Sequence, residues 1–202
     1  MKVIGLTGCA GSGKSYVSEC IRTRLGFPVI DSDSECKQLM GPGMAVTEEI
    51  FKIFGNEYKR EDGSLDRALL AKTVFANEDA LETLNAITHP ATIERICSML
   101  KAEEQAGTPV VFVESALAEQ AGYRTFCDEL WLVYASEEAR RQRLRDTRGY
   151  DEERIHNLIQ SQTPQGIMMN QCDRVIVNDV ADAEAEILRQ LQFHLESIGF
   201  RD

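Results

Sequence analysis

The stretch of sequence that decides the fold is Gly8-Cys9-Ala10-Gly11-Ser12-Gly13-Lys14-Ser15. It fits the pattern GxxxxGK(S/T) at every fixed position, and that pattern is typical of loops that bind nucleotide phosphates. The apolar run 3–6 precedes it and predicts a buried strand. Apolar residues at helical spacing follow over 14–25 and predict an amphipathic helix. This context distinguishes a phosphate-binding loop (P-loop) from a glycine turn with an incidental lysine.

Each part of the loop has a physical task. Glycines at positions 8, 11 and 13 let the backbone curl so that successive N–H groups face one point. The following helix adds the positive end of its dipole. The ammonium group of Lys14 can reach the β and γ phosphates, and the hydroxyl of Ser15 can ligate Mg²⁺. The sequence therefore predicts phosphoryl transfer from a nucleotide triphosphate to a small acceptor that carries a hydroxyl group.

Four further apolar runs predict the other strands of a sheet. They cover 28–30, 110–113, 129–134 and 174–177. The order of strand, loop, helix and strand at the start of the chain is how a parallel α/β sheet begins. We therefore predict an α/β fold of the three-layer P-loop kinase type, with a five-stranded parallel sheet and a last helix over 181–195.

The middle of the chain reads as mainly helical, and it is too long for a simple crossover between two strands. We therefore predict an inserted helical lobe over about 34–105. The expected helices and breaks are, in order, a Gly41-Pro42-Gly43 break, a Glu61-Asp62-Gly63 turn, a helix over 66–75, a helix over 79–87, an interruption at His89-Pro90, and a helix that resumes near Ala91.

Composition narrows the class of protein. The chain has 202 residues, of which 43% are hydrophobic, and this is enough for one globular domain. A net charge of −11 argues against general nucleic-acid binding. We find no membrane-spanning stretch and no signal peptide, so we expect a cytoplasmic protein without membrane contact. The six cysteines are scattered without metal-binding spacing, which favours reduced thiols. We expect a monomer or a weak homo-oligomer.

Three carboxylates follow predicted strands. Asp31 and Asp33 end the second strand, where alternation would put both on the same side of an extended chain. One of them can accept the proton of an attacking hydroxyl. The alternative is a helix cap, with Asp33 or Ser34 starting the next helix. Glu114 ends the third strand and can hold Mg²⁺ through water or hold the acceptor, or it can simply mark where the strand meets solvent.

Five arginines crowd one predicted helix and its exit, at positions 140, 141, 143, 145 and 148. Arg140 and Arg143 are three residues apart and share a face. Arginines on a mobile segment can close over a triphosphate and stabilise the transferring group. A solvated, mixed-charge helix face explains the remainder, so we expect one or two of the five to be functional.

Taken together, the residues resemble the dephospho-CoA kinase family over nearly the whole chain. The P-loop is shared with many kinases, whereas the ordered set of D-x-D, L-D-R and H-P is more specific. The matching segments are Gly5-Leu6-Thr7-Gly8, Val29-Ile30-Asp31-Ser32-Asp33, Gly63-Ser64-Leu65-Asp66-Arg67, Val74-Phe75, His89-Pro90, Val113-Glu114-Ser115-Ala116-Leu117, Arg143-Leu144 through Arg148-Gly149, Gln162, Asp173 and Asn178.

The resemblance implies transfer of phosphate from ATP to the ribose 3′-hydroxyl of dephospho-CoA, the last step of CoA biosynthesis, with Mg²⁺ as cofactor. It implies a single domain whose core is about 1–33, 106–138 and 172–202, with an acceptor lobe over about 34–105 and a lid over about 139–171. The implied catalytic residues are Lys14, Asp33 and Arg143. The implied ATP-binding residues are Gly8, Gly11, Ser12, Gly13, Lys14, Ser15, Tyr16, Arg140 and Arg148. The implied acceptor-binding residues are Asp31, Asp33, Arg67, His89 and Glu114, and Mg²⁺ would bind Ser15, with Asp33 or Glu114 holding it through water.

The chain departs from the family pattern in two places. A glutamate expected after the third strand appears as Gln120 or is shifted to Glu119, and Met168 stands where the family tends to have a basic residue. Two alternatives therefore stay open. One is a kinase for nucleosides or nucleoside monophosphates, and the other is a nucleotide-binding regulator without transferase activity.

Overall fold

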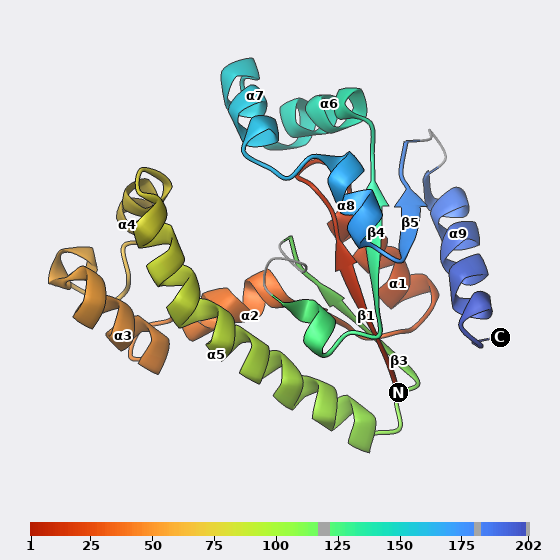
Figure 1. Ribbon diagram of the computed structural model, residues 1–202, viewed down its shortest axis with the longest axis horizontal. Coiled ribbons are helices and arrows are strands. Elements are labelled where there is room, and N and C mark those ends of the chain that lie inside the picture. Colours follow the sequence, from red (N-terminus) through yellow and green to blue (C-terminus); the bar gives the residue numbers. More distant parts are fainter. Residues whose placement is uncertain (117–121, 180–182, 201–202) are drawn as a thin grey trace. The chain divides into compact units, whose positions relative to one another are not determined.

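The computed structural model describes residues 1–116, 122–179 and 183–200 (Figure 1). Helices and strands alternate at both ends of the chain, and helices fill the middle. The elements in chain order are β1 (Lys2–Thr7), α1 (Lys14–Arg24), β2 (Val29–Asp31), α2 (Ser32–Leu39), α3 (Ala45–Phe54), the 3₁₀ turn η1 (Asn56–Tyr58), α4 (Arg67–Phe75), α5 (Glu78–Gln105), β3 (Val110–Glu114), the 3₁₀ turn η2 (Tyr123–Thr125), β4 (Glu129–Tyr134), α6 (Glu137–Arg148), α7 (Glu152–Gln160), α8 (Gln165–Gln171), β5 (Arg174–Val177) and α9 (Ala183–Ser197).

The strands form one sheet in the order β2-β3-β1-β4-β5. Strand β1 pairs in parallel with both β3 and β4, and β4 pairs in parallel with β5. The prediction of an α/β fold with a five-stranded parallel sheet is confirmed. Because β1 is the middle strand, the loop that follows it leaves the centre of the sheet's carboxyl edge, where open α/β sheets bind their ligands.

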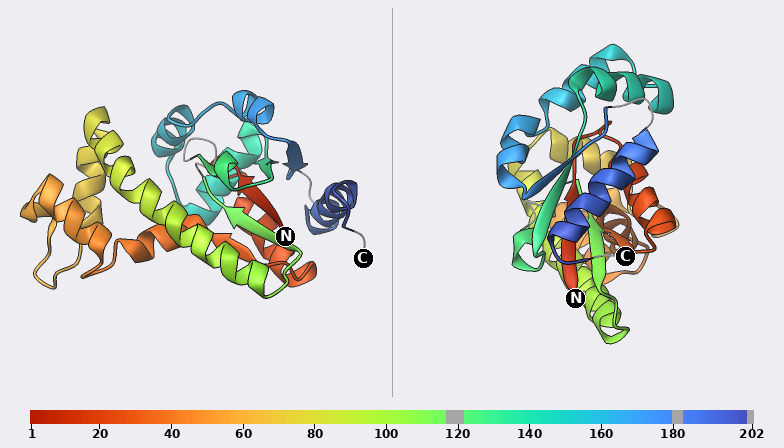
Figure 2. Two further views of the ribbon diagram at one scale, coloured as in Figure 1. Left: turned by 60° about the horizontal axis from the view of Figure 1, so that its bottom comes forward. Right: turned by 90° about the vertical axis from the view of Figure 1, so that its right-hand side faces the viewer.

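One face of the sheet is covered by α1 and α9, which contact each other (Figure 2). Alternate residues of the strands point to this face, among them Ile4 and Leu6 of β1 and Trp131 of β4. They pack against apolar residues such as Ile21 of α1 and Leu191 of α9, all of them buried. This packing fixes the start of α1, and with it the P-loop, on the end of β1.

The chain divides into two compact units. The sheet unit comprises Met1–Ile30 and Glu104–Asp202, and the helical unit comprises Asp31–Glu103. The helical unit has an apolar cluster of its own, built on Ile50, Phe51 and Leu70 from α3 and α4. The roles of acceptor lobe and lid that the sequence suggests for 34–105 and 139–171 stay predictions.

The predicted interruption at His89-Pro90 is wrong, because α5 runs without a break from Glu78 to Gln105 with Pro90 inside it. A proline in a helix interior costs about 3 kcal/mol, since it removes one backbone hydrogen bond and crowds the preceding turn. Leu84 and Ile87 before the proline and Ala91 after it pack against the same apolar cluster. Keeping these side chains on one face outweighs the cost of the proline.

The described parts of the chain contain no helix that is both long enough and apolar enough to cross a lipid bilayer. All six cysteines are in the described residues and none forms a disulfide; Cys9, Cys20 and Cys127 are buried.

Candidate phosphate-binding site

The P-loop joins β1 to α1 within the sheet unit. Gly11 and Gly13 have φ values of 80° and 85°, in the left-handed region that favours glycine. A side chain at Gly11 would also meet the Arg140 carbonyl oxygen, which is 2.7 Å from the position of a Cβ atom. Gly13 is the N-cap of α1, so the loop ends where the helix dipole is positive. The glycines at these two fixed positions of the motif are therefore required by the backbone.

Several backbone N–H groups around the loop and the start of α1 are left for a ligand. Within residues 1–116, 122–179 and 183–200, no group accepts a hydrogen bond from the N–H of Gly11, Gly13, Lys14 or Ser15. Unpaired N–H groups at a glycine-rich turn and a helix start form a concave site for anions. The backbone therefore provides the phosphate cradle that the motif predicts.

Beside the cradle lies a cluster of Lys14, Ser15 and Glu114, of which Glu114 is buried. The Lys14 ammonium is 2.8 Å from Glu114 Oε1, and the Ser15 hydroxyl donates to the same oxygen at 3.0 Å. The side chains of Lys14 and Glu114 are 12% and 6% exposed, so this is a buried ion pair. The structure thus brings together three residues that the sequence proposes for phosphate and metal binding.

The same cluster fits a magnesium ion. Ser15 Oγ and Glu114 Oε1 are hard oxygen ligands at 3.0 Å from each other. Magnesium in phosphoryl-transfer enzymes is usually held by one or two protein oxygens and completed by phosphate oxygens and water. The donor set present here is of that kind.

Glu114 is held in its ionised form. Burial opposes ionisation, but the charge of Lys14 and the hydrogen bonds from Lys14 and Ser15 outweigh it, so the pKa of Glu114 lies below its ordinary value of 4.5. A carboxyl whose pKa is lowered by folding stabilises the folded state above the unfolded pKa. That contribution is lost as the pH falls through the lower, folded pKa.

We therefore expect the free energy of unfolding of the protein without nucleotide to fall as the pH drops below about 4.5. Glu114→Gln should flatten this dependence, because the variant has no carboxyl to protonate. Urea unfolding over a pH series measures both slopes, with the exposed Glu153→Gln as a matched control. Equal slopes in the wild type and Glu114→Gln would contradict the pairing.

Arg140 reaches the P-loop backbone from α6. Its side chain is buried, with Nε donating to the carbonyl of Ala10 at 2.9 Å and Nη2 donating to Gln162 Oε1 at 2.8 Å. Gln162 Oε1 also accepts from the N–H of Ala10 at 3.1 Å. The backbone N–H and C=O of Ala10 are thus both hydrogen-bonded to side chains that follow β4 in the sequence. The bonds of Arg140 are thus to the loop backbone and to Gln162, and its predicted contact with ATP stays a prediction.

Arg143 also contacts the P-loop. Its Nη1 donates to the carbonyls of Ser12 at 3.2 Å and Gly11 at 3.4 Å, and its Nη2 donates to the carbonyl of Asn178 at 2.6 Å. Asn178 follows β5 and donates from Nδ2 to the Ser12 carbonyl at 2.8 Å. The carbonyl side of the loop is therefore held by α6 and by the end of β5.

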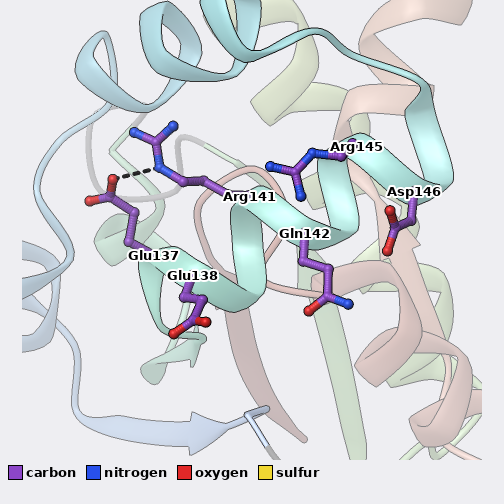
Figure 3. Close-up of a pocket in the computed structure, with 6 residues that line it drawn as sticks. All are labelled: Glu137, Glu138, Arg141, Gln142, Arg145 and Asp146. Carbon is purple, nitrogen blue, oxygen red and sulfur yellow. Dashed lines mark hydrogen bonds and ion pairs between the residues drawn. The ribbon is translucent and has the colours of Figure 1, made fainter.

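The remaining arginines of α6 lie elsewhere. Arg141 and Arg145 line a surface hollow with Glu137, Glu138, Gln142 and Asp146 (Figure 3). Arg141 pairs with Glu137 at 2.8 Å, and Arg145 pairs with Glu152. Arg148 is exposed in the last turn of α6. Two of the five arginines thus reach the P-loop, and at least two belong to a mixed-charge outer face; that one or two of the five are functional stays a prediction.

Met168, the departure from the family pattern, also lies against the loop. Its Sδ is 3.5 Å from Cys9 Sγ, and Cys9 Sγ is 3.8 Å from the carbonyl of Thr163. Burial raises the pKa of the Cys9 thiol, while the charge of Arg140 acts in the opposite direction. An uncharged side chain that accepts from the Cys9 thiol therefore occupies the position where a basic residue is typical. Tyr16, by contrast, is 43% exposed on the first turn of α1.

The expectation that Asp31 and Asp33 share one side of an extended chain is wrong. The extended segment ends at Asp31, and Asp33 lies in the first turn of α2. Asp31 itself caps this helix, because its Oδ1 accepts from the N–H of Ser34 at 3.0 Å. The cap predicted at Asp33 or Ser34 is therefore at Asp31, and Asp33 is an exposed carboxylate near the helix start.

Arg67 and His89 lie in the helical unit. Arg67 begins α4, and its Nη2 donates to the carbonyls of Lys37 at 2.5 Å and Met40 at 3.3 Å, near the end of α2. His89 is half-buried in α5, and burial lowers its pKa. The proposed contacts of both with an acceptor stay predictions.

Sequence reasoning gave no role to Gln162 or Asn178, although both bond to the P-loop backbone. Asn178 follows a parallel strand directly, so the rule that singled out Glu114 would also have found it. Gln162 follows α7 and carries no comparable local signal. The comparison at Leu117 and at Glu119 or Gln120, and the predicted helix start at Ala181, lie outside the described residues.

The chain matches a family model over most of its length. Residues 2–184 match the model described as dephospho-CoA kinase. A protein named dephospho-CoA kinase from Carboxydothermus hydrogenoformans is 34% identical over 95% of this chain and 94% of its own length. One of the same name from Geobacillus kaustophilus is 35% identical over 93% and 92%.

Solved structures are similar over nearly the full length. The Thermus thermophilus protein TT1252 has a TM-score of 0.86 and 28% identity, and the match covers 99% of this chain and 98% of that one. A dephospho-CoA kinase from Campylobacter jejuni has a TM-score of 0.71 and 24% identity, covering 98% and 100%. At 24% identity, the similarity to the Campylobacter jejuni protein shows a shared fold.

Proposed function

This chain belongs to the dephospho-CoA kinase family, and we propose that its P-loop carries the family's reaction, the transfer of the ATP γ-phosphoryl group to the ribose 3′-hydroxyl of dephospho-CoA. The observation that carries the proposal is the cluster of Lys14, Ser15 and Glu114 beside unpaired backbone N–H groups of the P-loop. A phosphoryl-transfer site needs this combination of a mobile cation, hydroxyl and carboxylate oxygens, and a preformed anion cradle.

On the donor side, the phosphates of ATP would replace Glu114 as the partner of Lys14. The N–H groups of Gly11, Gly13, Lys14 and Ser15 would bind phosphate oxygens, and the Lys14 ammonium would bridge the β and γ phosphates. These groups are fixed by the fold before the nucleotide arrives, so they stabilise the developing charge without reorganising during the reaction.

We propose Mg²⁺ as the cofactor, held by the Ser15 hydroxyl directly and by Glu114 or Asp33 through water. Mg²⁺ held there would supply positive charge that stabilises the phosphoryl oxygens. Once Lys14 turns to the phosphates, the buried Glu114 carboxylate needs a new positive partner. A water-bridged ion would satisfy that need.

On the acceptor side, we propose Asp33 as the base that accepts the proton of the 3′-hydroxyl. Asp33 is an exposed carboxylate two residues after the end of β2, in the first turn of α2. Asp31, Arg67 and His89, all in the helical unit, and Glu114 are proposed to bind dephospho-CoA. Arg140, Arg143 and Arg148 are proposed to contact ATP from the lid, whose closure would exclude water from the γ phosphate.

We further propose a cytoplasmic monomer or weak homo-oligomer that binds neither nucleic acid nor membranes. The net charge of −11 supports the absence of nucleic-acid binding, because polyanions bind to basic surfaces. Light scattering of the purified chain measures the oligomeric state.

The test of the function is direct. We expect the purified protein to convert dephospho-CoA to CoA with Mg-ATP, detected as the mass gain of one phosphoryl group, and to lose turnover when EDTA removes divalent ions. A parallel panel of nucleosides and nucleoside monophosphates provides competing acceptors.

Product from the panel and none from dephospho-CoA would contradict the proposed acceptor and identify a nucleoside or nucleotide kinase. A folded protein that binds ATP and yields product from no acceptor would instead be a nucleotide-binding regulator.

A further inference from the structure

The side of the P-loop that faces away from the cradle is held by groups distant in sequence. Arg140 binds the carbonyl of Ala10, Arg143 binds those of Gly11 and Ser12, and Asn178 binds that of Ser12. The described residues contain no cis peptide bond, so each peptide's C=O and N–H point in opposite directions. Holding the Ser12 carbonyl on one side therefore turns the Gly13 N–H to the other.

From this geometry we propose that Asn178 is a positioning residue of the phosphate site. Its Nδ2 donates to the Ser12 carbonyl at 2.8 Å, and the pair is fully enclosed, with Asn178 2% and Ser12 0% exposed. The Gly13 N–H, in the same peptide as that carbonyl, is thereby aimed at the position of a phosphate oxygen. The inference rests on the proposed function and adds a residue to which sequence reasoning gave no role.

Asn178 is itself rigidly placed. Its backbone N–H donates to the Tyr134 carbonyl at 2.8 Å, which extends the pairing of β5 with β4 by one residue. Its carbonyl accepts from Arg143 at 2.6 Å. A hydrogen-bond donor fixed at the end of a parallel strand holds its partner more precisely than a donor on a loop can.

The contact also explains the glycine at position 13. A Cβ atom there would lie much closer to Asn178 Nδ2 than van der Waals contact allows, and the φ of 85° already disfavours any side chain. Asn178 thus occupies the space that a side chain at position 13 would need. The close approach lets a short amide reach the loop carbonyl directly.

We expect Asn178→Ala to raise the Kd for ADP and the KM for ATP by roughly tenfold, because one fixed donor to the loop is lost. The KM for dephospho-CoA should stay unchanged, since the acceptor does not meet this peptide. The affinity for inorganic tripolyphosphate, measured by its competition with ADP, should fall by a similar factor. That result would locate the lost binding energy at the phosphates. Asn178→Asp keeps the side-chain volume and should lose more affinity for ADP than Asn178→Ala, because it places a carboxylate beside the phosphate site.

Two control variants separate positioning from general stability. Gln190 binds both the N–H and the carbonyl of Val177, the residue before Asn178, at 2.8 and 3.0 Å. Gln190→Ala therefore loosens the end of β5 without removing a bond to the loop, and should leave the Kd for ADP unchanged. Asn157→Asp adds the same negative charge as Asn178→Asp, but on the exposed face of α7. It should also leave the Kd for ADP unchanged.

Wild-type affinity for ADP in folded Asn178→Ala, or an equal loss in Gln190→Ala, would overturn the proposal. If Asn178→Ala does not fold, Asn178→Asp gives the same decision, and an unchanged Kd for ADP in that variant would overturn it. These outcomes are distinct from a failure of the proposed function, in which the wild type would bind ADP and make no CoA.

Discussion

Replacing Lys14 with alanine is expected to lower the turnover of dephospho-CoA by roughly 1,000-fold or more, because it removes the cation proposed to neutralise charge on the γ phosphoryl oxygens. In the protein without nucleotide this ammonium is 2.8 Å from Glu114 Oε1. The Lys14→Ala variant should still fold, since the apolar contacts of α1 with the sheet do not involve Lys14. CoA formation by mass and the melting temperature measure the two properties.

The design must separate lost chemistry from an unpaired buried charge. Lys14→Ala leaves Glu114 buried without its cation, which destabilises proteins by several kcal/mol in comparable cases. The double variant Lys14→Met with Glu114→Gln removes both charges and keeps similar side-chain volumes. Lys2→Ala, which breaks only the exposed pair with Asp128, is the matched control for loss of a lysine. Near-normal kcat in a folded Lys14→Ala protein would rule out the proposed phosphate contact.

Asp33→Asn is expected to lower kcat by about 100- to 10,000-fold while the Kd for ATP stays nearly the same. Asparagine has the same shape as aspartate but cannot accept the proton of the 3′-hydroxyl. The helix cap should be unaffected, because it is provided by Asp31. Single-turnover measurements with saturating ATP and dephospho-CoA isolate the chemical step.

The control for Asp33 is Asp62→Asn, which makes the same change at a surface turn of the helical unit. Its kcat should match that of the wild type. A pH profile adds a second readout, because the acidic limb of kcat that reports the base should disappear in Asp33→Asn. Equal kcat values in Asp33→Asn and the wild type would remove Asp33 as the base.

Strands and the P-loop could be predicted because their signals are local. Strands β4 and β5 begin and end at the predicted residues, since each is a short apolar run bounded by polar residues. The glycines at positions 11 and 13 by themselves predict a backbone with positive φ, which both residues have. The motif and its flanks together specify the centre of the sheet.

Features that depend on distant contacts could not be predicted in this way. Pro90 is tolerated in α5 because residues on both sides of it pack on one apolar cluster, which no local rule reveals. The bond from Asn178 to Ser12 joins residues 166 apart in sequence. The arginines of α6 look alike in sequence, and only the packing of the helix separates Arg140 and Arg143 from Arg141 and Arg145.

The order of strands in the sheet has a consequence for biosynthesis. Strand β1 ends at Thr7, but its two neighbours begin only at Val110 and Glu129. A ribosome makes the contiguous helical unit in between, so that unit can bury its own cluster while β1 still lacks a partner. Pairing over such separations is slow, because a long loop must close first. The P-loop is therefore synthesised well before the segments that hold it in shape, and on the proposed function ATP would stabilise the nascent chain fully only after Asn178 has emerged.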